Sequence, residues 1–285
     1  MARVFDVFIF FNELDLLDIR LNALNDKVDF FVLVESTISF SGKPKRLYYQ
    51  ENKHLFEKFN HKIIHHIIDD TPNSFEEIRA RFLNPKDELE KNIALHCLTT
   101  SNVPPGEVHW LREFYQKENM SRALTLSPIE KEDTCFISDL DEIWNPELDY
   151  ELEEDSIYKL KQLVYLGFLN NRSSEDWNGT IYSKYKNIYG SSVNHLDTQS
   201  KTKYTLVENG GWHFTYQGGS ESIKTKIENF GHQEYNNDSV KNRVNELLEN
   251  NQDVLGRTNF QFWTDESQLP KYLLDNKEKY KAFFK

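Results

Sequence analysis

The first 36 residues of this 285-residue chain carry the pattern that most constrains its fold. Val4–Phe11 is a run of β-branched and aromatic residues, interrupted only by Asp6, and it predicts a strand buried on both faces. Leucines then recur at helical spacing from Leu14 to Leu24, and Phe30–Val34 predicts a second buried strand. A strand, a helix and a strand in this order predict one right-handed βαβ unit of a parallel sheet.

The alternation of strands and helices continues through the first half of the chain. Helices are expected at residues 51–59, 87–98 and 110–124, and strands at 62–68 and 134–138. After Pro146 the pattern changes to strand-like segments at 163–169, 181–185 and 211–216, followed by a helical tail at 221–230, 239–250 and 271–284. We therefore predict an α/β fold with a mixed sheet flanked by helices, in a single domain over residues 1–285 with halves at 1–145 and 146–285.

The composition excludes some classes of partner. Lys and Arg total 34 and Asp and Glu total 46, so the formal net charge is −12, which argues against a general nucleic-acid or anionic-membrane binder. A small phosphorylated ligand held by a local cluster or a cation stays possible. No stretch approaches the ~18 apolar residues of a membrane span. Cys97 and Cys135 are too few for a disulfide framework or a zinc site, so we expect buried thiols and a protein of the reducing cytoplasm.

The sharpest local feature is an apolar strand that ends in three carboxylates. Phe136–Ser138 is followed directly by Asp139, Asp141 and Glu142. Ligands of open α/β sheets bind at the carboxyl ends of strands, and adjacent acids repel one another unless a cation joins them. Carboxylate oxygens suit Mg²⁺ or Mn²⁺, which can bridge the protein to a diphosphate. The alternative interpretation is a solvated acidic turn.

A second feature is an aromatic strand bracketed by glycines, Gly210–Gly219, which carries His213. A neutral ring nitrogen of His213 could complete the coordination of the same metal, although a core histidine on a Trp-rich strand is the plainer alternative. Glu221 follows at the start of a predicted helix. In a cleft it could accept a proton from a sugar hydroxyl, whereas at an exposed helix N-terminus it needs no function.

A third feature lies on the helix predicted at residues 110–124. Arg112 or Arg122 could pair with a phosphate if it faced the cleft, but an arginine on a helix is more often a surface ion-pair partner. The sequence also lacks a Gly-x-Gly-x-x-Gly after its first strand and a Gly-x-x-x-x-Gly-Lys-Ser/Thr. A Rossmann dehydrogenase and a P-loop NTPase are therefore both disfavoured.

Together these segments resemble one known family. The resemblance runs in order along the chain, through Asn12–Leu21, Val28–Ser36, Gly42–Pro44, Asp139–Ile143, Gly211–His213, Glu221 and Pro270–Leu274. This combination is similar to glycosyltransferase family 17, which includes an enzyme that adds bisecting GlcNAc to glycoproteins. The resemblance implies a GT-A-type fold and an inverting, metal-dependent transferase with an Asp-x-Asp motif that uses a nucleotide sugar, most often UDP-GlcNAc. From the order of the elements along the chain we also expect residues 1–145 to form the half that binds the nucleotide sugar and residues 146–285 to form the half on the acceptor side.

The resemblance also has departures. Trp144 stands where the family often has proline, and the membrane anchor and stem of the Golgi enzymes are not seen in this sequence. We therefore expect a cytoplasmic enzyme with no membrane span. Its acceptor would be a glycan, a lipid-linked sugar or a similar glycolipid, and it would not act on nucleic acid.

These inferences predict a site with three parts. Asp139 and Asp141 match the Asp-x-Asp of the family and His213 matches its Gly-Trp-His, so these three residues are expected to hold Mn²⁺ or Mg²⁺. The donor is expected to contact six residues: Asn12, Glu13, Glu35, Lys43, Arg122 and Asp139. Glu221 is the first candidate for the base that deprotonates the acceptor, followed by Glu234 and Asp176.

Other functions stay open at this stage. Asp139 could be the nucleophile of an Asp-x-Asp phosphohydrolase, although no Ser or Thr follows shortly after Asp141. A glycoside hydrolase would also use paired carboxylates, but it would need neither nucleotide nor metal. A third alternative is a glycan-binding module that keeps the fold without turnover.

Overall fold

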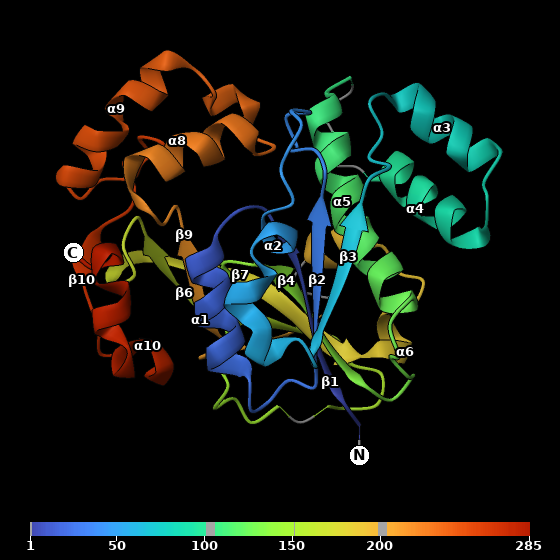
Figure 1. Ribbon diagram of the computed structural model, residues 1–285, viewed down its shortest axis with the longest axis horizontal. Helices are drawn as coiled ribbons and strands as arrows, with labels where there is room; N and C mark the ends of the chain where they lie inside the picture. Colours follow the sequence, from blue (N-terminus) through green and yellow to red (C-terminus); the bar gives the residue numbers. More distant parts are fainter. Residues whose placement is uncertain (1, 101–105, 151, 199–203) are drawn as a thin grey trace.

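The computed structural model describes residues 2–100, 106–150, 152–198 and 204–285, and one mixed β-sheet runs through the centre of this part of the chain (Figure 1). Its first half is parallel: β1 (Val4–Phe10) lies between β2 (Phe30–Ser36) and β4 (Thr134–Asp139), and β3 (Ile63–Ile68) lies outside β2. The predicted βαβ unit is confirmed, because α1 (Leu14–Leu24) connects β1 to the parallel strand β2.

The second half of the chain extends the same sheet with mostly antiparallel strands. The strand order is β3-β2-β1-β4-β7-β6-β9-β5, and two short strands pair off this path. The strands of the second half are β6 (Tyr158–Leu166), β7 (Asn171–Lys184), β8 (Thr205–Val207), β9 (Gly211–Thr215) and β10 (Phe262–Thr264), and β5 (Glu142–Trp144), at the end of the first half, pairs with β9. Because β4 pairs with β7, the carboxyl end of β4 lies where the two halves meet.

Helices cover both faces of the sheet because the strand side chains alternate between them. On β1, Phe8 joins the core cluster of α1, whereas Val7 joins that of the long helix α5 (Val108–Thr125). The first face also carries α2 (Tyr48–Glu51), α10 (Lys271–Asp275) and the 3₁₀ segments Lys53–Phe59 and Lys277–Phe283. The second carries α3 (Phe75–Leu83), α4 (Glu88–Thr99), α6 (Tyr185–Ile188) and α7 (Val193–Thr198).

A third, smaller core forms where two helices of the second half stack together. Helices α8 (Gly219–Asn229) and α9 (Asp238–Glu249) pack through Ile223, Ile227 and Val244. Backbone bonding ties the end of α8 to the first half, since the amide of Ser41 donates to the carbonyl of Asn229 at 3.3 Å. The carboxyl-terminal end of α8 therefore lies beside the loop that follows β2.

The predicted fold class is confirmed, since the sheet is mixed, flanked by helices and followed by helical segments at the carboxyl terminus, an arrangement consistent with a GT-A-type fold. Two predicted helices are less regular than expected: residues 51–59 and 271–284 are mainly 3₁₀. Helix α3 was not predicted, although Ser74 caps it by accepting a hydrogen bond from the amide of Glu77. In the described part of the chain, no helix has the length and apolar character that spanning a membrane requires.

Candidate active site

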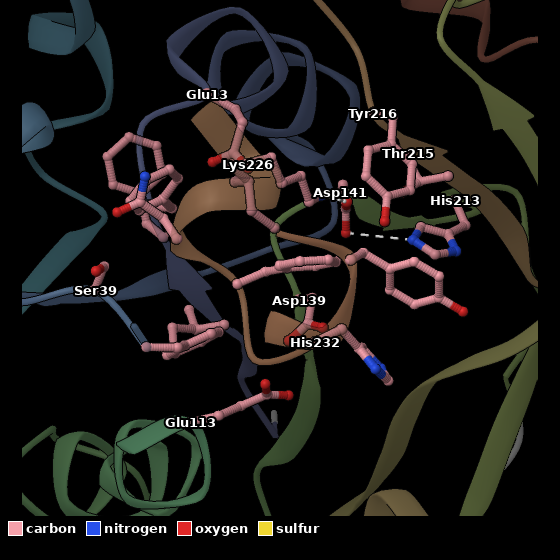
Figure 2. A pocket seen from close by; sticks show the side chains of 18 of the residues that line it. Glu13, Ser39, Glu113, Asp139, Asp141, His213, Thr215, Tyr216, Lys226 and His232 are labelled. Carbon is pink, nitrogen blue, oxygen red and sulfur yellow. Dashed lines mark hydrogen bonds and ion pairs between the residues drawn. The ribbon is translucent and has the colours of Figure 1, made fainter. Parts of the chain in front are cut away.

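A cavity of about 390 Å³ opens at the carboxyl ends of β1 and β4, where the two halves of the sheet meet (Figure 2). This is the edge at which open α/β sheets bind ligands. The residues that line it fall within three stretches of the chain, 9–45, 113–141 and 164–257. The charged residues that line it are Glu13, Lys45, Glu113, Lys117, Asp139, Asp141, Glu175, Lys226 and Arg257. Four cations thus face five carboxylates, so the cavity is far closer to neutral than the net charge of −12 suggests.

A buried arginine fixes the backbone of Asp139–Glu142, the segment that we call the acidic turn. Arg20 of α1 forms an ion pair with Asp6 of β1 at 2.7 Å, and both side chains are fully buried. The same guanidinium donates to the backbone carbonyls of Asp139 and Leu140 at 3.0 Å and of Glu142 at 2.8 Å. Five donors in a rigid plane suit this task, because they can satisfy several carbonyls at once. Arg20 therefore sets the path of the backbone that presents both aspartates.

The sequence analysis missed this role of Arg20 and Asp6. The signal was present, since Asp6 interrupts an apolar strand and Arg20 lies between Ile19 and Leu21 on the buried face of α1. A charged residue at such a position requires a buried partner. The indole of Trp144 also donates to Asp6, at 3.1 Å. The unusual tryptophan after the acidic turn thus belongs to the same buried network.

Asp141 lies between a histidine and a lysine. Its carboxylate is 2.8 Å from the ammonium of Lys226 on α8 and 3.5 Å from the ring of His213 on β9 (Figure 2). Burial by itself would raise the pKa of Asp141, but Lys226 and His213 outweigh it and hold the pKa well below its usual range. Burial would likewise lower the pKa of Lys226, and Asp141 raises it instead. Both groups are therefore charged at neutral pH.

The pairing of β5 with β9 explains why His213 reaches this position. Glu142 lies opposite His213 in the antiparallel register, and the amide of Phe214 donates to the carbonyl of Asp141 at 2.8 Å. The indole of Trp177 on β7 donates to Glu142 at 2.5 Å and lies 5.1 Å from the ring of His213. The sequence analysis predicted that Asp141 and His213 lie together, and the backbone pairing of β5 with β9 is the reason that they do.

The expected metal ligands all line the cavity, but their arrangement does not fit a metal ion. The carboxylate of Asp139 faces Lys117 at 3.4 Å, while that of Asp141 faces Lys226. Across the described ranges, no three His, Cys, Asp or Glu side chains gather in a group that could hold a metal. The predicted Mn²⁺ or Mg²⁺ stays a prediction, and no step below depends on it.

The residues predicted to contact the donor differ in whether they line the cavity. Glu13 lines it next to Lys45, whereas Asn12 and Lys43 do not line it. Glu35 is fully buried beneath the cavity, where it accepts from Lys45 at 3.2 Å. Glu35 thereby holds in place Lys45, a cavity residue that the sequence analysis did not single out.

Arg122 has a structural partner away from the cavity. Its guanidinium donates to Asp70 at 3.1 Å and to the hydroxyl of Tyr115 at 3.3 Å. Burial opposes the charge of Arg122, but Tyr115 and Asp70 raise its pKa. Arg122 therefore follows the alternative noted from the sequence, an ion pair, and does not line the cavity.

The three predicted bases also lie outside the lining of the cavity. Glu221 is 86% exposed in its side chain and pairs with Lys224 one turn along α8. Glu234 pairs with His232 at 2.6 Å, and Asp176 pairs with Arg172 at 2.5 Å. Exposed carboxylates with local partners of this kind are typical of protein surfaces. Glu175, which precedes Asp176, is the only carboxylate that the described residues of the second half contribute to the cavity lining.

Comparisons with known proteins agree with the resemblance drawn from the sequence. The sequence model of glycosyltransferase family 17 matches residues 1–87, so the predicted resemblance is confirmed for the segment that contains β1, β2 and β3. The β-1,4-mannosyl-glycoprotein 4-β-N-acetylglucosaminyltransferases of Homo sapiens and Rattus norvegicus are each 30% identical over 134 residues. These matches cover 46% of this chain but only 20% of each relative, so the chain aligns with about a fifth of their length. No solved structure matches the chain.

Proposed function

We propose that this chain is a glycosyltransferase that moves a sugar from a nucleotide sugar to a hydroxyl of a glycan, with inversion at the anomeric carbon. The observation that carries the proposal is the cavity at the carboxyl ends of β1 and β4, with the Arg20-held acidic turn at its base. The match of residues 1–87 to glycosyltransferase family 17 supports it. The names of the mammalian relatives favour N-acetylglucosamine as the sugar, and UDP-GlcNAc is the first donor to test.

The lining of the cavity suggests where each substrate binds. The nucleoside would lie against Phe10, Phe40 and Lys45, at the ends of β1 and β2, and the diphosphate would lie beside the acidic turn. The acceptor would enter on the side of β6, β7 and β9, where Val164, Trp177 and Thr215 line the cavity. An exposed tryptophan suits this side, because sugar rings stack on aromatic faces.

The reaction would be a single displacement. The oxygen of the acceptor hydroxyl attacks the anomeric carbon, the bond from that carbon to the β-phosphate oxygen breaks, and UDP leaves with the bonding electrons. The proton of the hydroxyl passes to a carboxylate on the acceptor side. We assign this role to Glu175, because Glu221, Glu234 and Asp176 do not line the cavity. General-base assistance typically contributes about 10²–10⁴-fold to the rate.

The test is UDP release from UDP-GlcNAc in the presence of candidate acceptors, including mannose-terminated oligosaccharides and lipid-linked sugars. Reactions are run both with Mn²⁺ and with EDTA, so that a need for metal does not hide the activity. We expect UDP release that depends on an acceptor. Hydrolysis of phosphoesters without any sugar donor would instead indicate the phosphohydrolase. Glycan binding without UDP release under either condition would indicate a binding module.

A further inference from the structure

Each aspartate of the acidic turn is paired with a lysine from a helix that borders the cavity. Lys117 of α5 faces Asp139 at 3.4 Å, and Lys226 of α8 faces Asp141 at 2.8 Å. The two helices belong to different halves of the chain and both lysines line the cavity. Positive charge is thus supplied to the turn by the protein itself.

Lys226 is held firmly at this position. It lies in a carboxyl-terminal turn of α8, and its ammonium is 5.4 Å from the centre of the Tyr216 ring, within the range of a cation–π contact. Glu13, which also lines the cavity, adds a further attraction to the ammonium. A charge that is already oriented stabilises a transition state without a cost of reorganisation.

A metal ion and Lys226 would compete for the same carboxylate. Mg²⁺ or Mn²⁺ bonds to carboxylate oxygens at about 2 Å. An ion bonded to Asp141 at that distance would lie next to an ammonium that is itself 2.8 Å from Oδ2, and the two cations would repel each other. Binding of one cation therefore weakens binding of the other at this carboxylate.

We propose that Lys226 takes the place of a divalent cation at the diphosphate of the donor, so that the chain binds nucleoside diphosphates without metal. This inference rests on the proposed function. The ammonium carries three N–H donors, and Asp141 accepts from it in the structure. On the cavity side it would donate to the phosphate oxygens. Its charge would stabilise the negative charge that grows on the leaving diphosphate.

The first experiment needs no variant. UDP is titrated by calorimetry into protein that has been freed of metal by EDTA and into the same protein with Mn²⁺ added. We expect the two dissociation constants to agree within about twofold. Binding that requires Mn²⁺ would overturn this inference while leaving the proposed function intact. Absence of UDP binding in both conditions would overturn this inference and would exclude a UDP-sugar as the donor in the proposed function.

The second experiment asks whether Lys226 is the group that acts. Lys226→Met should weaken UDP binding in EDTA by roughly 10- to 100-fold, the usual effect of losing a hydrogen bond between charged groups. Lys224→Met is the matched control, because Lys224 lies on the same helix but pairs with exposed Glu221. That control should bind UDP like the unmodified chain, and Lys226→Arg should retain most of the affinity.

The same variant also tests whether UDP binding comes to depend on a metal ion once Lys226 is lost. Without the competing ammonium, Asp141 and His213 become available to a metal, so Mn²⁺ should restore part of the UDP affinity of Lys226→Met. The melting temperature of each variant is measured to check that it folds. A Lys226→Met protein that binds UDP in EDTA as tightly as the unmodified chain would overturn the inference.

Discussion

The carboxylates of the acidic turn and those on the surface of α8 differ in how far along the chain their partners lie. Asp141 of the turn is paired with Lys226, 85 positions further along the chain, and Arg20 reaches the backbone of the turn from about 120 positions away. Glu221 on α8 is paired with Lys224, only three positions away. Tertiary structure places the first kind of carboxylate in a cavity, whereas the second kind finds its partner within its own helix. An acidic residue in a motif therefore has a site role only if distant elements position it.

The largest expected effect comes from removing the arginine beneath the turn. Arg20→Met leaves Asp6 buried without its cation, and breaking a buried pair from one side costs about 3–5 kcal/mol of the free energy of unfolding. Urea unfolding should show a lower midpoint with an unchanged slope.

Arg79→Met is the control for that prediction, because Arg79 is exposed and faces Glu76 one turn away on α3. Its free energy of unfolding should change by less than about 0.5 kcal/mol. Equal losses in Arg20→Met and Arg79→Met would show that the buried network does not hold the turn.

The next effect concerns the acceptor side of the cavity. Glu175→Gln should lower turnover by about 10²–10⁴-fold, because the amide cannot take the proton of the acceptor hydroxyl. UDP binding should be unchanged, since Glu175 lies on β7, away from the expected diphosphate. The rate is measured as acceptor-dependent UDP release.

The matched variants Glu13→Gln and Glu113→Gln change the other glutamates that line the cavity. If either of these loses turnover while Glu175→Gln keeps it, the base lies on the opposite wall, in the parallel half.

A smaller effect is expected at Trp177, which lines the cavity and is 38% exposed. Trp177→Ala should raise the KM for the oligosaccharide acceptor by roughly 3- to 10-fold, in line with the ~0.5–1.5 kcal/mol of aromatic stacking. The dissociation constant for UDP should not move. Trp177→Phe retains a ring but loses the hydrogen bond to Glu142, so it separates stacking from positioning. If Trp177→Phe raises the KM as much as Trp177→Ala does, the effect comes from loss of the hydrogen bond to Glu142.

The smallest effect is expected at the residue that the sequence ranked first as the base. Glu221→Gln should keep UDP release within about twofold of the unmodified rate, since the side chain is solvent-exposed and its pairing with Lys224 is local. The free energy of unfolding should change by less than about 0.5 kcal/mol. A turnover loss comparable to that of Glu175→Gln would mean that α8 moves during the reaction.

Much of the fold was predictable because its signals are local. The apolar run at Val4–Phe11 and the leucines of α1 each report burial through their own spacing, and the parallel pairing of β1 with β2 follows from the helix between them. Helix α3 was missed because its pattern is short and lies in a mixed segment. Residues 271–284 were predicted as one helix, but the chain kinks after α10 and continues as a 3₁₀ segment.

The candidate site was only partly predictable. Asp139 and Asp141 were found because they follow a buried strand, and His213 because it lies on a glycine-bracketed one. Lys226 and Glu175 carry no motif, so their places in the cavity lining follow from the packing of α8 and from the position of β7 in the sheet.

By itself the sequence determined the strand–helix–strand start, the acidic turn at the end of β4 and the resemblance to glycosyltransferase family 17, because these depend on residues that are near neighbours in the chain. Only the tertiary structure decided which charged groups share the cavity and which pair at the surface. The physical reason is that an ion pair depends on distance in space. The chain order does not reveal that α8 brings Lys226 to Asp141 while it leaves Glu221 in solvent.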